Sequence, residues 1–426
     1  MTKKSGYLPR LADIQLKKYL ETFGAVCIEG PKWCGKTRTA EEMSRSRIYL
    51  GDPAGGFQNR SLAAMAPAAV LKGETPRLID EWQEVPPLWD AVRFQVDHAD
   101  ALGQFLLTGS ATPNHKGILH SGAGRIARLR MRPMSLWESG DSDGKVSLLR
   151  LLHGELEPEI TGEVALERLV QLIVRGGWPA SLSVAPENQS LLPQQYLKAV
   201  LDDDATRIDG IQRNRKKLEL VLRSLARNEA TTAGVQTICR DIADCDGETV
   251  ERVTVYSYLD VFSRLFLIDN QRPFAPSVRS SVRIKQAEKR HLCDPSLAAA
   301  LLGMKAEALT ADLPTMGFLF EALCERDLRI YAEALGAELF HYQDYKNREI
   351  DAVIALPTGE WTAIEIKLGA NQIDAAAEGL LKLQKALAKE DPANAPSVLC
   401  VLCGMTNAAY RRPDGVFVVP LLSLKP

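Results

Sequence analysis

The sequence predicts an α/β protein of several domains, with a parallel sheet in the first domain, a helical middle region and a second α/β domain at the end. The chain has 426 residues, and folded domains usually span roughly 100–200 residues, so we expect two to four of them. Its apolar fraction of 46% and charged fraction of 25% are those of ordinary globular chains. In the first third, short apolar runs alternate with helical spacing, which predicts parallel strands joined by helices.

Composition also narrows the class of protein. No window of about 18 apolar residues occurs, so we expect neither a membrane span nor a membrane partner. The stretch from Met1 to Arg10 lacks the apolar core of a secretory signal, which predicts a cytoplasmic protein. The eight cysteines are scattered. The C-x-x-C pair, Cys400 and Cys403, encloses apolar residues typical of a buried strand, so we expect reduced thiols rather than disulfides or zinc.

A glycine-bounded loop near the N-terminus has the pattern of a phosphate-binding site. The apolar run Ala25–Ile28 leads into G-P-K-W-C-G-K-T, residues 30–37, which matches G-x-x-x-x-G-K-[ST]. In such a P-loop the backbone N–H groups and the following helix N-terminus converge on phosphate oxygens. We expect Lys36 to neutralise the β- and γ-phosphates of ATP and the Thr37 hydroxyl to bind Mg²⁺. The candidate nucleotide-binding residues are Gly30, Pro31, Lys32, Trp33, Cys34, Gly35, Lys36, Thr37 and Arg38.

Two carboxylates follow the next clear strand. The segment R-L-I-D-E, residues 77–81, places Asp80 and Glu81 at the end of an apolar run. We expect this strand to lie beside the P-loop strand, with Asp80 holding Mg²⁺ through water and Glu81 activating the attacking water as a catalytic base. Alone, such a pair is also typical of a solvated turn, but its position after a P-loop favours the catalytic interpretation.

A third strand and an arginine complete the predicted site. The run Gln104–Leu107 leads to T-G-S, where Ser110 is a candidate catalytic hydroxyl near the γ-phosphate or, alternatively, part of a helix cap or turn. Arg125 precedes a predicted strand from Ala127 to Met131 and is a candidate arginine finger, acting across subunits if the protein forms a homo-oligomer. Arg128 and Arg132 are competing candidates, and an arginine with only a surface position is an equal alternative.

These motifs occur together in a recognisable order. They are Tyr7-Leu8-Pro9-Arg10, the P-loop, Leu78-Ile79-Asp80-Glu81-Trp82-Gln83, Leu107-Thr108-Gly109-Ser110, Gly124-Arg125-Ile126 and Arg132-Pro133-Met134-Ser135. Over nearly the whole chain, the sequence resembles the AAA-type ATP-binding proteins of bacteria and archaea that carry a C-terminal domain of unknown function. The resemblance implies ATP binding and hydrolysis, and it implies no single physiological role.

The middle of the chain predicts a connector and a DNA-binding type of fold. A polar break at residues 139–144 suggests domain 1–140, followed by a helical connector or lid at 141–215. Apolar spacing then predicts three helices: one along Leu218–Leu225, one opening near Thr231, and one after Thr249. A strand-like Leu267–Asp269 completes a winged helix-turn-helix at 216–290. Its basic residues are candidates for phosphate contacts, with DNA expected rather than RNA, although winged helices also serve as protein joints or ATPase lids: Lys216, Lys217, Arg252, Arg264, Arg279, Arg283, Lys285, Lys289 and Arg290.

The tail, 291–426, predicts a helix and a strand hairpin that gather carboxylates. A helix from Met316 to about Tyr331 is followed by predicted strands 338–342, 348–355 and 361–367. Alternation puts Glu365 and Lys367 on one face, and a turn near Gly359 would bring Asp351 beside Glu365. With Glu321 this set resembles the D…E-x-K signature of restriction-endonuclease-like folds, although no proline precedes Asp351. Such a set suits a divalent metal and a polarised water.

Three functions follow from these features, and the sequence leaves all three open. The first is a Mg²⁺-dependent ATPase that acts as a switch or motor on nucleic acid. The second is a metal-dependent nuclease gated by ATP. The third is a non-catalytic scaffold that holds a nucleotide and uses its tail as a docking platform.

Overall fold

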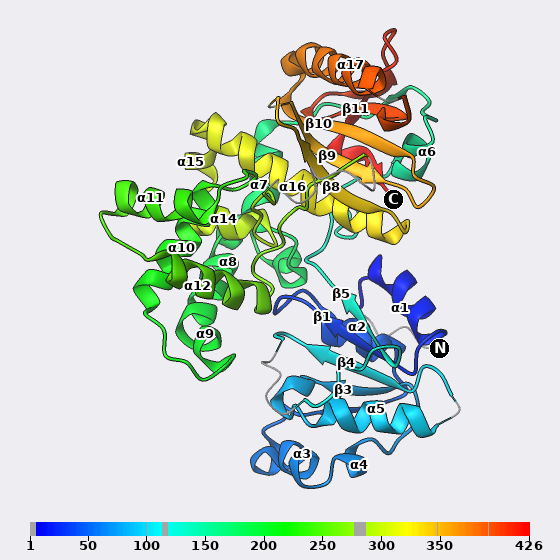
Figure 1. Ribbon diagram of the computed structural model, residues 1–426, viewed down its shortest axis with the longest axis vertical. Coiled ribbons are helices and arrows are strands. Elements are labelled where there is room, and N and C mark those ends of the chain that lie inside the picture. The colour runs from blue at the N-terminus through cyan, green and yellow to red at the C-terminus, as the bar shows by residue number, and fades with distance from the viewer. Residues whose placement is uncertain (1–5, 100, 113–117, 277–286, 347, 391) are drawn as a thin grey trace.

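A computed structural model describes residues 6–99, 101–112, 118–276, 287–346, 348–390 and 392–426. It shows an N-terminal α/β domain, a helical region, and a C-terminal sheet flanked by helices (Figure 1). The helical region lies beside both sheets, so that the three parts form one connected body (Figure 1). Within the described residues, no helix has both the length and the apolar character that crossing a membrane requires.

The N-terminal domain is built on a five-stranded parallel sheet. Its strands stand in the order β2 (Ser46–Tyr49), β3 (Arg77–Asp80), β4 (Phe105–Gly109), β1 (Ala25–Glu29) and β5 (Ile126–Arg130). The expectation that the strand ending in Asp80 would lie beside the P-loop strand is wrong, because β4 lies between them. Strand order depends on long-range pairing, which a short apolar run does not encode.

Helices cover both faces of this sheet, which explains why its strands are apolar throughout rather than alternating. On one face, α1 (Ala12–Leu20) and α2 (Lys36–Met43) share a core with Val26, Ile28 and Leu106. On the other face lie α3 (Ala54–Met65), α4 (Pro67–Val70) and α5 (Leu88–His98), packed on Cys27, Ile79 and Leu107. Parallel strands in this arrangement bring their carboxyl ends, and the loops after them, to one edge.

The helical region contains the predicted helices with one shifted boundary. Its helices are α7 (Leu166–Arg175), α8 (Leu191–Ala199) with a π-helical turn Val200–Asp204, α9 (Ala205–Arg207), α10 (Arg215–Arg227), α11 (Val235–Asp246), α12 (Arg252–Arg264), α14 (Pro295–Leu301) and α15 (Ala306–Ala311). The helix predicted to open near Thr231 begins at Val235, because Thr231 instead forms a β-bridge with Arg290.

A two-stranded ladder follows α12. Ile268 bridges Leu292 and Gln271 bridges Lys289. We call residues 267–271 and 289–293 the wing ladder, after the winged helix-turn-helix that the sequence predicts there, which stays a prediction. The predicted phosphate-binding residues Arg279, Arg283 and Lys285 lie outside the described residues.

The C-terminal sheet has seven strands and is covered on both faces. The order is β7 (Glu159–Ile160), β12 (Ala408–Arg411), β13 (Phe417–Pro420), β11 (Val398–Met405), β10 (Trp361–Gly369), β9 (Glu349–Ala355) and β8 (Glu338–Gln343). Helix α16 (Leu313–Ala334) contacts β8, β9 and β10, and α17 (Ile373–Glu390) contacts β10 and β11. The predicted hairpin is confirmed: β9 and β10 are antiparallel, with Ile364 opposite Ala352. Cys400 and Cys403 are buried in β11 with free thiols.

Part of the predicted helical connector belongs to this C-terminal domain. β7 pairs with β12, and β6 (Val146–Ser147) pairs with β14 (Leu424–Lys425) at the chain end. A short helix, α6 (Leu148–Leu152), lies between β6 and β7. The expectation of a purely helical connector from residue 141 is therefore wrong for residues 146–160, because two-residue strands carry too little periodicity to be recognised.

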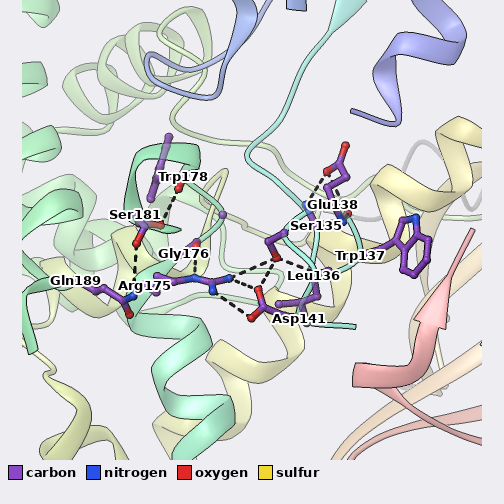
Figure 2. A network of polar contacts seen from close by, with 12 residues as sticks. Ser135, Leu136, Trp137, Glu138, Asp141, Arg175, Gly176, Trp178, Ser181 and Gln189 are labelled. Carbon is purple, nitrogen blue, oxygen red and sulfur yellow. Dashed lines mark hydrogen bonds and ion pairs between the residues drawn. The ribbon is translucent and has the colours of Figure 1, made fainter. Parts of the chain in front are cut away.

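A buried polar network joins the helical region to the segment that leaves the N-terminal domain (Figure 2). Arg175, at the end of α7, pairs with Asp141 at 2.5 Å, and both side chains are less than one-tenth exposed. Gly177 accepts a hydrogen bond from the Met134 N–H and donates its own N–H to Asp294. Buried charges of this kind are costly to separate, so the network fixes how the helical region meets the N-terminal domain.

We expect Gly177→Ala to destabilise this junction strongly. A Cβ at residue 177 would lie 2.2 Å from the Met134 carbonyl oxygen and 2.8 Å from its nitrogen, so backbone would have to move, at a cost of about 2–3 kcal/mol. Gly379→Ala is the matched control, because its Cβ would meet nothing within 4 Å on α17 and alanine favours a helix by about 1 kcal/mol. Denaturant unfolding checks both. Equal stability of the two variants would contradict the packing described.

Candidate functional site

The P-loop lies at the carboxyl edge of the N-terminal sheet, between β1 and α2. Its backbone passes so close to residue 131 that a Cβ on Gly30 would lie 2.0 Å from the Met131 carbonyl oxygen, and Gly30 has φ +155°. Only glycine fits there. The loop therefore turns sharply between β1 and α2, in the strand–loop–helix order that the motif predicts.

Lys36 and Thr37 occupy the first turn of α2. The Lys36 ammonium donates to the carbonyl oxygens of Gly30 and Pro31 at 2.9 and 2.8 Å. The Thr37 hydroxyl donates to Asp80 Oδ1 at 2.8 Å. The structure thus brings together the hydroxyl and the carboxylate that sequence reasoning assigned to one Mg²⁺. It does so although β1, which leads to Thr37, and β3, which carries Asp80, are not neighbours.

The intervening strand β4 supplies the missing connection. The Thr108 hydroxyl donates to Asp80 Oδ1 at 2.6 Å and accepts the Glu81 N–H at 3.0 Å. Burial raises the pKa of the Asp80 carboxyl, while the hydrogen bonds from Thr108 and Thr37 act in the opposite direction. Sequence reasoning noted T-G-S but gave Thr108 no such role, since only the strand order reveals it.

Ser110 contacts Glu81. Its hydroxyl donates to Glu81 Oε2 at 3.0 Å, and Gln83 donates to the same oxygen. Glu81 itself has a left-handed backbone with φ 56°, which turns its side chain out of the strand. Two donors, Ser110 and Gln83, therefore orient the carboxylate of Glu81, the predicted base. In this structure the Ser110 hydroxyl thus contacts Glu81.

The helical region closes the other side of the site. A cavity of about 550 Å³ is lined by the P-loop and α2, by Glu81, and by Pro179, Ala180 and Leu192 of the helical region. Lys32 pairs with Asp204 at 2.6 Å, and the Trp33 ring lies 5.8 Å from that of Tyr196. Asp204 ends a run of three aspartates that looks like an ordinary solvated helix face in the sequence, so its contact with the P-loop was missed.

The segment that carries this wall is itself firmly held. Trp178 donates its indole N–H to Ser296 at 3.0 Å, and the Trp178 carbonyl accepts from the Ser181 hydroxyl (Figure 2). Gln189 donates in turn to the Ser181 carbonyl (Figure 2). Pro179 and Ala180 therefore belong to a fixed turn rather than to a free loop.

The N-terminal segment supports the P-loop from behind. The buried Arg10 guanidinium donates to the carbonyl oxygens of Cys34 at 2.6 Å and Arg132 at 2.8 Å, and it pairs with Glu138 at 3.1 Å. The sequence signal was the Tyr7–Arg10 motif, whose role no local pattern explains.

The candidate arginine finger lies away from its own site. Arg125 precedes β5, and its carbonyl accepts the N–H of Ala25, at the edge of the sheet opposite the P-loop. Its side chain pairs with Asp97 at 2.7 Å. Arg132, one competitor, is buried and pairs with Asp269 and Glu333 at 2.5 Å each, which excludes it as a finger. A role of Arg125 across subunits stays a prediction.

The predicted C-terminal residues also converge. Lys367 on β10 donates to Asp351 at 3.1 Å and to Glu365 at 2.7 Å, as the hairpin register requires. Glu321 projects from α16 toward the same place. Burial, together with the Asp351 carboxylate, raises the pKa of Glu321 to about 7 and that of Glu365 to about 8.

One residue of this second cluster was not expected. Lys289 of the wing ladder donates to Glu321 at 2.7 Å, although sequence reasoning placed it among phosphate-binding residues. Over the part of the chain that the structure describes, no group of three or more His, Cys, Asp or Glu side chains is arranged to hold a metal ion. The metal role of Glu321, Asp351, Glu365 and Lys367 therefore stays a prediction.

Known protein families match three separate parts of the chain. Residues 22–139 match a family described as an AAA domain, while residues 166–308 and 316–424 match two domains of unknown function, DUF8612 and DUF4143. The AAA match spans the P-loop, Asp80, Glu81 and Ser110, and it supports a P-loop ATPase type of domain there. The winged-helix and restriction-endonuclease-like assignments of the other regions stay predictions.

Similar whole chains add little about function. The uncharacterized proteins Mb2031c of Mycobacterium bovis and Rv2008c of Mycobacterium tuberculosis are 22% identical over 361 residues, or 84% of this chain and 73% of theirs. A Walker-type ATPase of Pyrococcus abyssi has 14% identity and a TM-score of 0.40, covering 70% of this chain and 97% of that one. The ORC2 protein of Aeropyrum pernix has 13% identity and a TM-score of 0.30, covering 73% and 98%.

Proposed function

We propose that this protein binds and hydrolyses Mg²⁺–ATP at the P-loop and uses the nucleotide state to reposition its helical region. The observation that carries the proposal is the linked set of polar contacts Thr37–Asp80, Thr108–Asp80 and Ser110–Glu81. In this set, the hydroxyl and the carboxylate that would bind the metal lie near the carboxylate that would act as the base, at the N-terminus of the helix that follows the P-loop. The donor set, hard oxygen atoms next to a lysine ammonium, fits a magnesium-bound triphosphate.

Each residue has a task in this reaction. Lys36 would exchange its two loop carbonyls for the β- and γ-phosphates. Thr37 and Asp80 would hold Mg²⁺, which when bound draws charge from the transferred phosphoryl group. Glu81, oriented by Ser110 and Gln83, would accept a proton from the attacking water.

The far wall of the cavity suits the base of the nucleotide. Pro179, Ala180 and Leu192 present an apolar surface that faces the P-loop side chains. A nucleotide lying between these two surfaces would contact both the N-terminal domain and the helical region. Loss or hydrolysis of the nucleotide would then weaken the contact that it makes between the two parts. The Lys32–Asp204 pair and the polar network of Figure 2 would still hold the helical region to the N-terminal domain.

Lys36→Ala and Glu81→Gln should separate binding from chemistry. We expect Lys36→Ala to weaken ATP binding by about 10- to 100-fold, since a charge-assisted contact is worth about 1.5–3 kcal/mol. Glu81→Gln should keep ATP affinity and slow hydrolysis by about 100- to 10,000-fold. Equilibrium binding and phosphate release measure the two effects. Glu42→Gln, on an exposed position of α2, is the control, and hydrolysis that persists unchanged in both site variants would refute the assignment.

Leu192→Asp tests the apolar wall. A carboxylate there would remove apolar contact with the base and repel the phosphates, so we expect about 10-fold weaker ATP binding. Leu191→Asp is a matched control, because Leu191 is half-exposed and is not among the residues that line the cavity. Equal affinity of the two variants would mean that the base lies elsewhere.

We further propose that the switch acts on nucleic acid through α10–α12 and the wing ladder. Arg252 and Lys216 are exposed at the start of α12 and α10, respectively. The predicted phosphate contact of Arg264 is not available, because this side chain is only 13% exposed and binds Thr112 and Asp209. The support for this proposal is thus the helix arrangement and the exposed basic side chains.

Arg252→Glu should weaken binding to short duplex DNA and lower the salt dependence by about one phosphate contact. Fluorescence anisotropy at several salt concentrations measures both. Lys382→Glu, on the exposed face of α17, is the control. If the wild-type protein binds no DNA at low salt and retains ATP without turnover, the scaffold alternative is favoured instead.

The nuclease alternative has one observation in its favour, the convergence of Asp351, Glu365 and Lys367 on one face of the sheet. It requires a divalent metal in that cluster. Lys289 already donates to Glu321 in that cluster.

A further inference from the structure

Lys289 is the most deeply buried charged side chain of the C-terminal cluster. Its side chain is 1% exposed, and its ammonium lies 2.7 Å from Glu321, 3.3 Å from Glu349 and 3.7 Å from Asp351. These carboxylates come from α16 and β9, whereas Lys289 comes from the wing ladder. A cation from one part of the chain is thus enclosed by the carboxylates of another.

The backbone around Lys289 is fixed on both sides. Its N–H and carbonyl exchange hydrogen bonds with Gln271 at 3.0 Å each. The Gln271 side chain is buried and donates to the carbonyl oxygens of Phe340 and Asp351. The wing ladder is therefore attached to β8 and β9, and the ammonium enters the cluster from a set position rather than by a flexible reach.

The two lysines of the cluster contact different carboxylate oxygens, and the Lys289 ammonium lies where a divalent metal could bind. Lys367 binds Asp351 Oδ2 and Glu365 on one side. Lys289 lies nearer Glu321 and the other Asp351 oxygen, Oδ1. A divalent metal shared by Glu321 and Asp351 would have to lie about 2.0–2.6 Å from an oxygen of each. The Lys289 ammonium faces the same two oxygens, at 2.7 Å from Glu321 Oε1 and 3.7 Å from Asp351 Oδ1.

We propose that Lys289 is an internal cation that occupies the metal position of this cluster, so that the Glu321–Asp351 site is closed to divalent cations until Lys289 is removed. The site is then a latent metal site of the Mg²⁺ or Mn²⁺ class, made of carboxylates from α16 and β9. The wing ladder controls access to it. This proposal does not depend on the nucleotide site.

Electrostatics agrees with this geometry. Although burial lowers the pKa of Lys289, the carboxylates of Glu321, Asp351 and Glu349 raise it well above its ordinary value. Although burial raises the pKa of Asp351, Lys289 and Lys367 hold it below its ordinary range. Lys289 and Asp351 thus shift each other's pKa in the directions expected of an ion pair.

The test is Mn²⁺ binding to the full chain without nucleotide, followed by electron paramagnetic resonance and calorimetry. We expect Lys289→Met to bind one more Mn²⁺ per chain than the wild-type protein. The double variant Lys289→Met with Asp351→Asn should lose this additional ion. Because both proteins carry the same P-loop, their difference reports the C-terminal cluster alone.

A second variant guards against misfolding. Lys289→Gln removes the charge but can still donate a hydrogen bond to Glu321, and thermal unfolding shows whether each variant is folded. Folded Lys289→Met or Lys289→Gln protein that binds no additional Mn²⁺ would overturn the proposal, leaving Lys289 as a purely structural ion pair.

A comparison of Mn²⁺ binding by the wild-type chain and by Asp351→Asn tests the proposal without a change at Lys289. Mn²⁺ binding by the wild-type chain that disappears in Asp351→Asn would also overturn the proposal, because the site would then be open in spite of the ammonium. Wild-type and Asp351→Asn chains that bind Mn²⁺ equally would support it.

Discussion

The Arg326 guanidinium lies between the carboxylates of Asp294 and Asp327, and all three side chains are buried. Asp294 also accepts the N–H of Gly177, and Asp327 accepts the N–H of Leu136. The exit from the N-terminal domain, the turn after α7 and helix α16 are thereby joined through one charged centre. Since an unpaired charge in such a place costs several kcal/mol, none of these segments can leave alone without a large penalty.

Helix α16 extends this centre to the second cluster. Asp327 lies near the middle of the helix, and Glu321 lies less than two turns closer to its N-terminus. One end of this stretch therefore contacts the segment leaving the AAA-type domain, and the other contacts Lys289. The nucleotide cavity is connected to the same centre through Trp178, which donates to Ser296 next to Asp294. The two sites thus share a rigid element, although they lie in different domains.

The sequence was informative where the chemistry is local. Eight consecutive residues specify the P-loop, and alternation along one hairpin specifies how Asp351 meets Glu365. It was uninformative where partners are distant in the chain. The position of β4 between β1 and β3, the bond from Thr108 to Asp80, and the Lys32–Asp204 pair all depend on tertiary packing. Lys289 was misassigned for a related reason: a lysine in a basic stretch looks solvated until a carboxylate from elsewhere is seen to enclose it.

The C-terminal domain is assembled from two separate stretches of the chain. Ala408 pairs with Ile160 in the seven-stranded sheet, and Leu424 pairs with Val146 in a separate two-stranded sheet, so residues 146–160 join the C-terminal domain before the helical region begins. Contacts between such distant residues form late during folding, because a long loop must close first. During synthesis on the ribosome, residues 146–160 would stay without their strand partners until the last part of the chain has emerged. A fragment starting at residue 291 would leave the edge of β12 uncovered, and an open edge of this kind is prone to pair with other chains.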